Sequence, residues 1–139
     1  MAHNMDDPLL LECAGLEILG FVNKGPEWTP RDRPAFLREI VECLRTGAEP
    51  KRDITAMARA AQVSPIRLVR SFRRTYGISL ARFMRVLQMQ RALNLLSDPV
   101  LSISTVAVEA GYSDQSHMTR EFVRTYGVTP AVFRRLELV

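Results

Sequence analysis

The chain has 139 residues, 47% of them hydrophobic, and a formal charge of +4, so it can fold around one ordinary core but has little room for a large catalytic cleft. The charge is uneven: residues 1–50 hold five Lys+Arg against nine Asp+Glu, or −4, whereas residues 51–139 hold fourteen against six, or +8. Thirteen of those fourteen are arginine, which suits forked hydrogen bonds to phosphates or guanine, although a solvated basic face accounts for the charge equally well.

The N-terminal part combines an apolar segment with a polar stretch. Residues 9–22 are apolar but too short to span a bilayer, and no signal-like leader precedes them, so we expect no membrane segment and a cytoplasmic location. Residues 23–32 are predicted to be a linker. Cys13 and Cys43 lie in apolar helical patterns with no histidine nearby, and we expect both to be buried, in a reducing compartment.

A helix is predicted next, over residues 33–47, where a proline stands near the start and a glycine at the end. One stripe of apolar residues recurs at helical spacing along it: Phe36, Leu37, Ile40, Val41 and Leu44. This stripe is expected to pack on the motif that follows.

Residues 54–79 and 103–129 are two copies of one pattern, and both contain the tetrapeptide RTYG. Alanine, serine and phenylalanine recur at matched positions, at an offset of 49 residues that becomes 50 after one insertion. Each copy has the pattern of two helices joined by a tight turn, with Asp53 and Ser102 as N-caps of the first helices. The chain is therefore expected to use one helical unit twice.

The turns and helix ends of the two copies also follow from the residues. Gly111 can adopt the left-handed conformation that a sharp turn needs, whereas Gln62 stands in that place in the first copy, at a cost of about 1 kcal/mol. The second helix is expected to begin at Ser64 with Pro65 in the first copy and at Ser113 or Asp114 in the second. It is expected to end at Gly77 in the first copy and at Gly127 in the second.

The outer faces of the second helices carry the candidate DNA-binding residues. At about 100° per residue, the apolar side of each helix turns inward and leaves an arginine-containing side outward. In the first copy the outward residues are Ile66, Arg67, Arg70, Arg73 and Arg74. In the second they are Ser116, His117, Arg120, Val123 and Arg124, with Gln115 and Thr119 on the flanks. Such side chains bind phosphates and read base edges, and the second helix is where a recognition helix lies.

Residues 79–98, between the copies, are predicted to form one helix. Its length of roughly 27 Å is comparable to the ~34 Å between successive major-groove faces of B-DNA. It could therefore set two recognition helices about one turn of DNA apart, while its Met and Leu residues serve as core.

Residues 106–134, VAVEAGYSDQSHMTREFVRTYGVTPAVFR, resemble the second motif of the AraC/XylS family of bacterial transcription regulators. Residues 83–96 resemble the linker helix of that family and residues 63–79 its first motif. The resemblance covers residues 33–139 and departs from the family pattern at Leu80, where proline is usual, and at Gln88, where arginine is common. Neither departure is expected to change the fold.

The resemblance implies sequence-specific binding of double-stranded promoter DNA, with two recognition helices in adjacent major grooves. The residues that would enter the grooves are Ile66, Arg67, Val69, Arg70 and Arg73 from the first motif, and Gln115, Ser116, Thr119 and Arg120 from the second. The helical wheel places Val69 half inward.

The expected fold is all-α, with roughly seven helices in two helix-turn-helix subdomains, a long linker helix and an extra N-terminal helix. Residues 1–32 resemble the end of a sensor or dimerisation domain, and residues 33–139 would be the DNA-binding domain. Within that domain the first motif is placed at about 53–77, the linker helix at about 79–97 and the second motif at about 102–127.

The resemblance also implies partners. RNA polymerase would be recruited or obstructed at the promoter, and residues 9–22 would either pair two chains as a homodimer or fold back on their own chain. The chain is either a fragment of a longer regulator, which we favour, or a small member without a sensor of its own.

Other function classes stay open at this stage: a protein-interaction module that keeps the fold without DNA, or the DNA-binding half of a fused repair alkyltransferase. Neither cysteine lies in a reactive context, and no cofactor or metal is expected. We do not expect an enzyme, because His3 and His117 are the only histidines and no nucleotide-binding or metalloprotease motif occurs. The pairing of His117 with Glu121, at helical spacing, is more typical of a surface contact.

Overall fold

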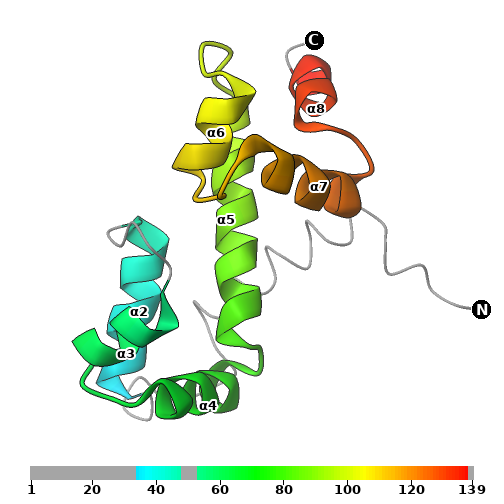
Figure 1. Ribbon diagram of the computed structural model, residues 1–139. Helices are drawn as coiled ribbons and strands as arrows, with labels where there is room; N and C mark the ends of the chain where they lie inside the picture. The colour runs from blue at the N-terminus through cyan, green and yellow to red at the C-terminus, as the bar shows by residue number, and fades with distance from the viewer. Residues whose placement is uncertain (1–33, 48–52, 138–139) are drawn as a thin grey trace, which may run out of the picture. The chain divides into compact units, whose positions relative to one another are not determined.

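Figure 1 shows the computed structural model of the chain, which describes residues 34–47 and 53–137. Every regular element within them is an α-helix: α2 (Ala35–Thr46), α3 (Ile54–Ala60), α4 (Pro65–Tyr76), α5 (Leu80–Leu96), α6 (Ile103–Glu109), α7 (Gln115–Tyr126) and α8 (Pro130–Glu137). The all-α prediction is confirmed. None of these helices is long and apolar enough to cross a membrane. The predictions for residues 1–32, including Cys13 and His3, lie outside the described residues.

The first compact unit of the fold ends at Leu87. Helices α2 and α3 both pack against α4, and the beginning of α5 completes the core. Aromatic rings of α4 and α5 pack together in it at tilted angles, since the Phe72 centroid lies 4.7 Å from that of Tyr76 and 5.5 Å from that of Phe83. Its buried residues are Leu37, Ile40, Val41, Leu44, Met57, Ala58, Leu68, Phe72, Tyr76, Leu80, Phe83, Met84 and Leu87.

The prediction that Cys43 is buried is wrong, because its thiol is free and exposed on α2. The residue stands one position before the buried Leu44, and one position turns a helix by about 100°. Its apolar neighbours in the sequence are therefore not its neighbours in space.

The second compact unit begins at Gln88. Helix α7 packs against both α6 and α8, and the end of α5 supplies the rest of the core. The Phe122 ring of α7 lies 4.7 Å from Tyr126 and 5.4 Å from Phe133 of α8, measured between centroids. The buried residues of this core are Met89, Ala92, Leu96, Val106, Ala107, Ala110, Tyr112, Met118 and Phe122.

Helix α5 contributes to both cores, and the boundary between the two units falls within it. Its first half carries buried residues of one core and its second half those of the other. This explains why apolar residues recur along the whole helix without forming one continuous stripe.

The predicted caps form in both copies of the motif. Asp53 accepts a hydrogen bond from the backbone N–H of Thr55 at 2.8 Å, and Ser102 accepts one from Thr105 at 3.0 Å. Ser64 caps α4, and Asp114 rather than Ser113 caps α7. Both second helices end at a left-handed glycine, with φ of 73° at Gly77 and 72° at Gly127.

The two turns have the same geometry although their residues differ. Gln62 has φ of 57° and Gly111 has φ of 91°, so both adopt the left-handed region. In each copy the backbone N–H of the residue after the turn donates a hydrogen bond to the carbonyl oxygen of a fully buried alanine. The N–O distance is 3.0 Å from Val63 to Ala58 and 2.9 Å from Tyr112 to Ala107. The predicted turn at Gln62 is confirmed, and its left-handed conformation costs about 1 kcal/mol relative to glycine.

Candidate nucleic-acid interface

The outer face of α4 is a dense group of cations. Its four arginines, Arg67, Arg70, Arg73 and Arg74, are all exposed, and α4 contains no acidic residue. None of the four forms an ion pair within the described part of the chain. Arg67 extends over the ring of Phe36, with its guanidinium carbon 5.8 Å from the ring centroid, and that contact holds the side chain against α2.

Two apolar side chains lie among these arginines. Ile66 is 65% exposed and Val69 is 37% exposed, so neither serves as core. A shallow hollow of about 350 Å³ runs along the same face, lined by Ser64, Ile66, Arg67, Arg70, Ser71 and Arg74. Guanidinium and hydroxyl groups bind phosphate oxygens, and an exposed aliphatic group can contact the thymine methyl.

The face of α7 is more polar and less charged. Gln115, Ser116 and Arg120 are exposed, while Thr119 is half-buried. The start of the helix is fixed by Asp114, whose carboxylate accepts a hydrogen bond from the backbone N–H of His117 at 2.7 Å. These residues offer hydrogen-bond donors and acceptors at the N-terminal end of the helix, where a recognition helix meets base edges.

His117 is half-buried, so it is less exposed than Ser116 and Arg120 on the same helix. Its Nδ1 lies 3.1 Å from the hydroxyl oxygen of Ser113, and its ring meets Tyr112 edge to face at 5.3 Å. The surface contact between His117 and Glu121 that their spacing suggested does not form. Glu121 instead accepts a hydrogen bond from Nη2 of Arg124 at 3.1 Å, because the guanidinium is a full positive charge at ordinary helical spacing.

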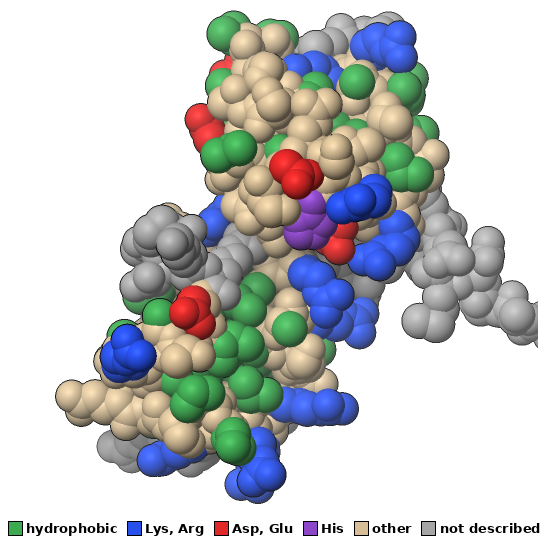
Figure 2. All heavy atoms as spheres, viewed as in Figure 1, with side chains coloured by type: hydrophobic (Ala, Val, Ile, Leu, Met, Phe, Trp, Pro, Cys, Tyr) green, Lys and Arg blue, Asp and Glu red, His purple; other side chains and the backbone are tan. Residues whose placement is uncertain are grey.

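The structure thus exposes ten of the twelve residues named as DNA-binding candidates and half-buries His117 and Thr119. Figure 2 shows Lys and Arg side chains projecting from the surface, with fewer acidic groups in this view. The role of each candidate in binding DNA stays a prediction.

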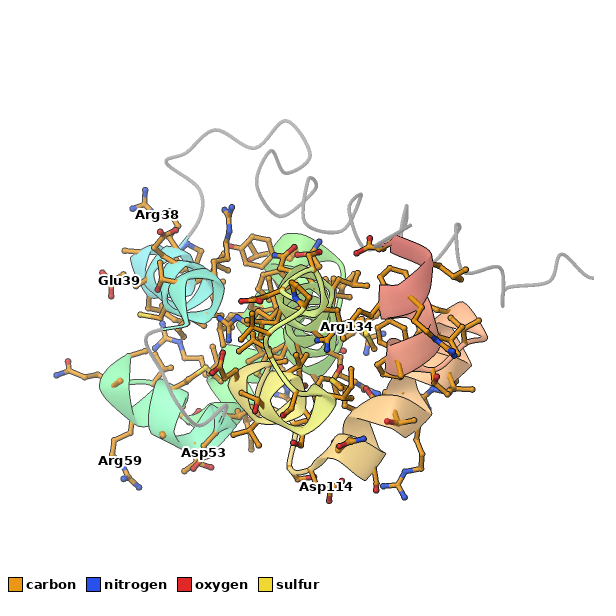
Figure 3. All side chains as sticks on the ribbon, turned by 90° about the horizontal axis from the view of Figure 1, so that it is seen from above. Arg38, Glu39, Asp53, Arg59, Asp114 and Arg134 are labelled. Atoms are coloured by element: carbon orange, nitrogen blue, oxygen red, sulfur yellow. The ribbon has the colours of Figure 1, made fainter. Side chains whose placement is uncertain are left out.

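Two residues with clear roles were missed by the sequence reasoning. Glu121 was considered only as a partner of His117, although Arg124 at i+3 was an available signal. Arg134 was noted only as part of a motif, yet its Nε donates to the carbonyl of Leu96 at 3.0 Å and its Nη1 to that of Leu101 at 2.7 Å. Figure 3 shows Arg134 directed inward, whereas Arg38 and Arg59 point away from the fold.

Comparison with known proteins places this geometry among helix-turn-helix proteins. A family model described as "Helix-turn-helix domain" matches residues 57–136, more than half of the chain. The chain is 36% identical over 104 residues to the HTH-type transcriptional regulator GlxA of Rhizobium meliloti (strain 1021), covering 75% of this chain and 32% of the relative. It is 33% identical over 116 residues to the transcriptional activator RhrA of the same organism, covering 82% and 36%.

The fold is also similar to a solved structure, the DNA-binding domain of AdpA, a global transcriptional factor crystallised in complex with a target DNA. The TM-score is 0.66 at 24% identity, and the match covers 72% of this chain and 90% of that one. The chain spans about a third of the length of GlxA and RhrA.

Proposed function

The chain belongs to the AraC/XylS family of transcription regulators, and from that premise we propose that it binds promoter DNA sequence-specifically through α4 and α7. The observation that carries the proposal is the presence of exposed arginines on the second helix of both helix-turn-helix units. Five of the six arginines on these helices form no ion pair among the described residues, so their charge is available to phosphates.

Each helix would enter a major groove, the two grooves lying about one turn of DNA apart. The proposed contacts are those named from the sequence: Ile66, Arg67, Val69, Arg70, Arg73 and Arg74 on α4, and Gln115, Ser116, His117, Thr119, Arg120 and Arg124 on α7. Helix α5, continuous from Leu80 to Leu96, would act as the spacer. Residues 33–139 would form the DNA-binding domain.

The outcome for the cell would be regulation of transcription in the bacterial cytoplasm, by recruiting RNA polymerase or obstructing it. Activation is favoured, since RhrA is named a transcriptional activator. Residues 1–32 would be the end of a sensor or dimerisation domain, through which two chains could pair.

Salt dependence tests the DNA-binding proposal directly. If about five arginines neutralise phosphates, the logarithm of the association constant falls with the logarithm of salt concentration at a slope of roughly −4 to −5. Fluorescence anisotropy with labelled duplex, repeated over a range of salt concentrations, measures this slope. A protein-interaction module that keeps the fold without DNA would give no salt-dependent binding to duplex, and that result would overturn the proposal.

A further inference from the structure

The two recognition helices are copies of one motif but differ in charge. Helix α4 carries four arginines and no acidic residue, a formal charge of +4. Helix α7 carries Arg120 and Arg124 together with one acidic residue, Glu121, a formal charge of +1 with histidine neutral. The two recognition helices can therefore be compared directly, because one is strongly basic and the other is nearly neutral.

The difference concentrates at one matched position. Fifty residues apart, Ser71 on α4 corresponds to Glu121 on α7, and Arg74 corresponds to Arg124. Glu121 is 20% exposed at its side chain and holds Arg124, which is 70% exposed, at 3.1 Å. Arg74 forms no ion pair among the described residues.

We propose that Glu121 determines how the chain divides its binding between general affinity and base recognition. To bind a phosphate, Arg124 must either break its ion pair with Glu121 or bring the negative carboxylate of Glu121 close to the negative phosphate. Both weaken the contact between Arg124 and the phosphate. Helix α4 therefore supplies most of the salt-dependent affinity, whereas α7 depends on its contacts to bases. The proposal rests on the proposed function, because it requires both helices to face DNA.

Reciprocal substitution between the copies tests this division. The probe is a random-sequence duplex of roughly 30 base pairs, about three helical turns, which reports general affinity alone. Glu121→Ser should bind it about two- to fivefold more tightly at low salt, and the salt slope should steepen by up to about 0.9. Ser71→Glu should change both quantities by similar amounts in the opposite direction. Glu109→Ser removes the same charge from α6 and should have a smaller effect than Glu121→Ser.

The mechanism requires Arg124, so the gain of Glu121→Ser should fall to about that of Glu109→Ser when both are compared in an Arg124→Gln background. An undiminished gain in the double variant would refute the pairing, and so would an unchanged affinity and slope in Glu121→Ser. Glu121→Gln keeps the length of the side chain and should bind the random duplex as much more tightly as Glu121→Ser. The test therefore still decides if the serine variant fails to fold.

Failure of this inference differs from failure of the proposed function. A parent chain that binds the random duplex with a steep salt slope while Glu121→Gln changes nothing would refute the inference alone. A parent chain that does not bind the duplex at all would refute both.

Discussion

Replacing Arg134 with alanine should destabilise the second unit strongly. The guanidinium joins α8 to the C-terminal end of α5 and to the following turn, through bonds of 3.0 Å to the carbonyl of Leu96 and 2.7 Å to that of Leu101. A hydrogen bond from a charged donor contributes about 1.5–3 kcal/mol. Nη2 is buried without a hydrogen-bond partner in the described chain, which offsets about 1–3 kcal/mol of that gain. Two such bonds together contribute about 3–6 kcal/mol, so the expected net loss on truncation is centred at about 2–3 kcal/mol.

Urea denaturation followed by far-UV circular dichroism measures this loss, with Arg135→Ala as the control, because that side chain is exposed on the same helix. The control should stay within about 0.5 kcal/mol of the parent. Arg134→Lys keeps the charge but cannot span both carbonyls, so it should recover less than half of the loss. If Arg134→Ala were as stable as Arg135→Ala, the two bonds would contribute nothing and the account of how α8 is held would be wrong.

The remaining predictions concern the turns, the base contacts and the spacer. Gln62→Gly should raise the free energy of unfolding by up to about 1 kcal/mol, because it relieves a left-handed glutamine at φ 57° but adds freedom to the unfolded chain; a lower midpoint of thermal unfolding would contradict this. Gly127→Ala should cost about 1 kcal/mol from conformation alone, since an added Cβ meets nothing within 4 Å; a loss several times larger, measured by urea denaturation, would point to a clash that the structure does not contain. Arg70→Ala and Arg120→Ala should each cost about 1–3 kcal/mol and relax the preference at one base position, whereas an equal loss on every sequence in a binding assay would identify a phosphate contact. Two alanines inserted between Leu87 and Gln88 should turn one motif relative to the other by ~200° and abolish tight binding to a two-box site; retained affinity in a gel-shift titration would exclude α5 as a rigid spacer.

The helices and their ends could be predicted because their causes are local. Ser64, Asp53 and Ser102 cap a helix by bonding to residues two or three positions away, and Gly77 and Gly127 end one by their own backbone freedom. The repeat then assigned the turn at Gln62 by analogy with its second copy. Such signals do not depend on how the chain packs.

The surroundings of the residues that the sequence did not predict depend on how the helices pack. The hydrogen-bond partners of Arg134 lie 38 and 33 residues away in the sequence, so no local sequence pattern predicts them. His117 is half-buried, and its ring lies 5.3 Å from that of Tyr112, measured between centroids. Cys43 was misjudged because apolar neighbours in sequence do not define a face of a helix.

Selection of bound sites from a random DNA pool tests the central claim most directly. If α4 and α7 read successive major grooves, the enriched sequences should contain two boxes centred about 10–10.5 base pairs apart. Repeating the selection with Arg70→Ala should relax one box, and with Arg120→Ala the other. A single enriched box that only one of these substitutions alters, or a pool with no preferred sequence, would contradict the account.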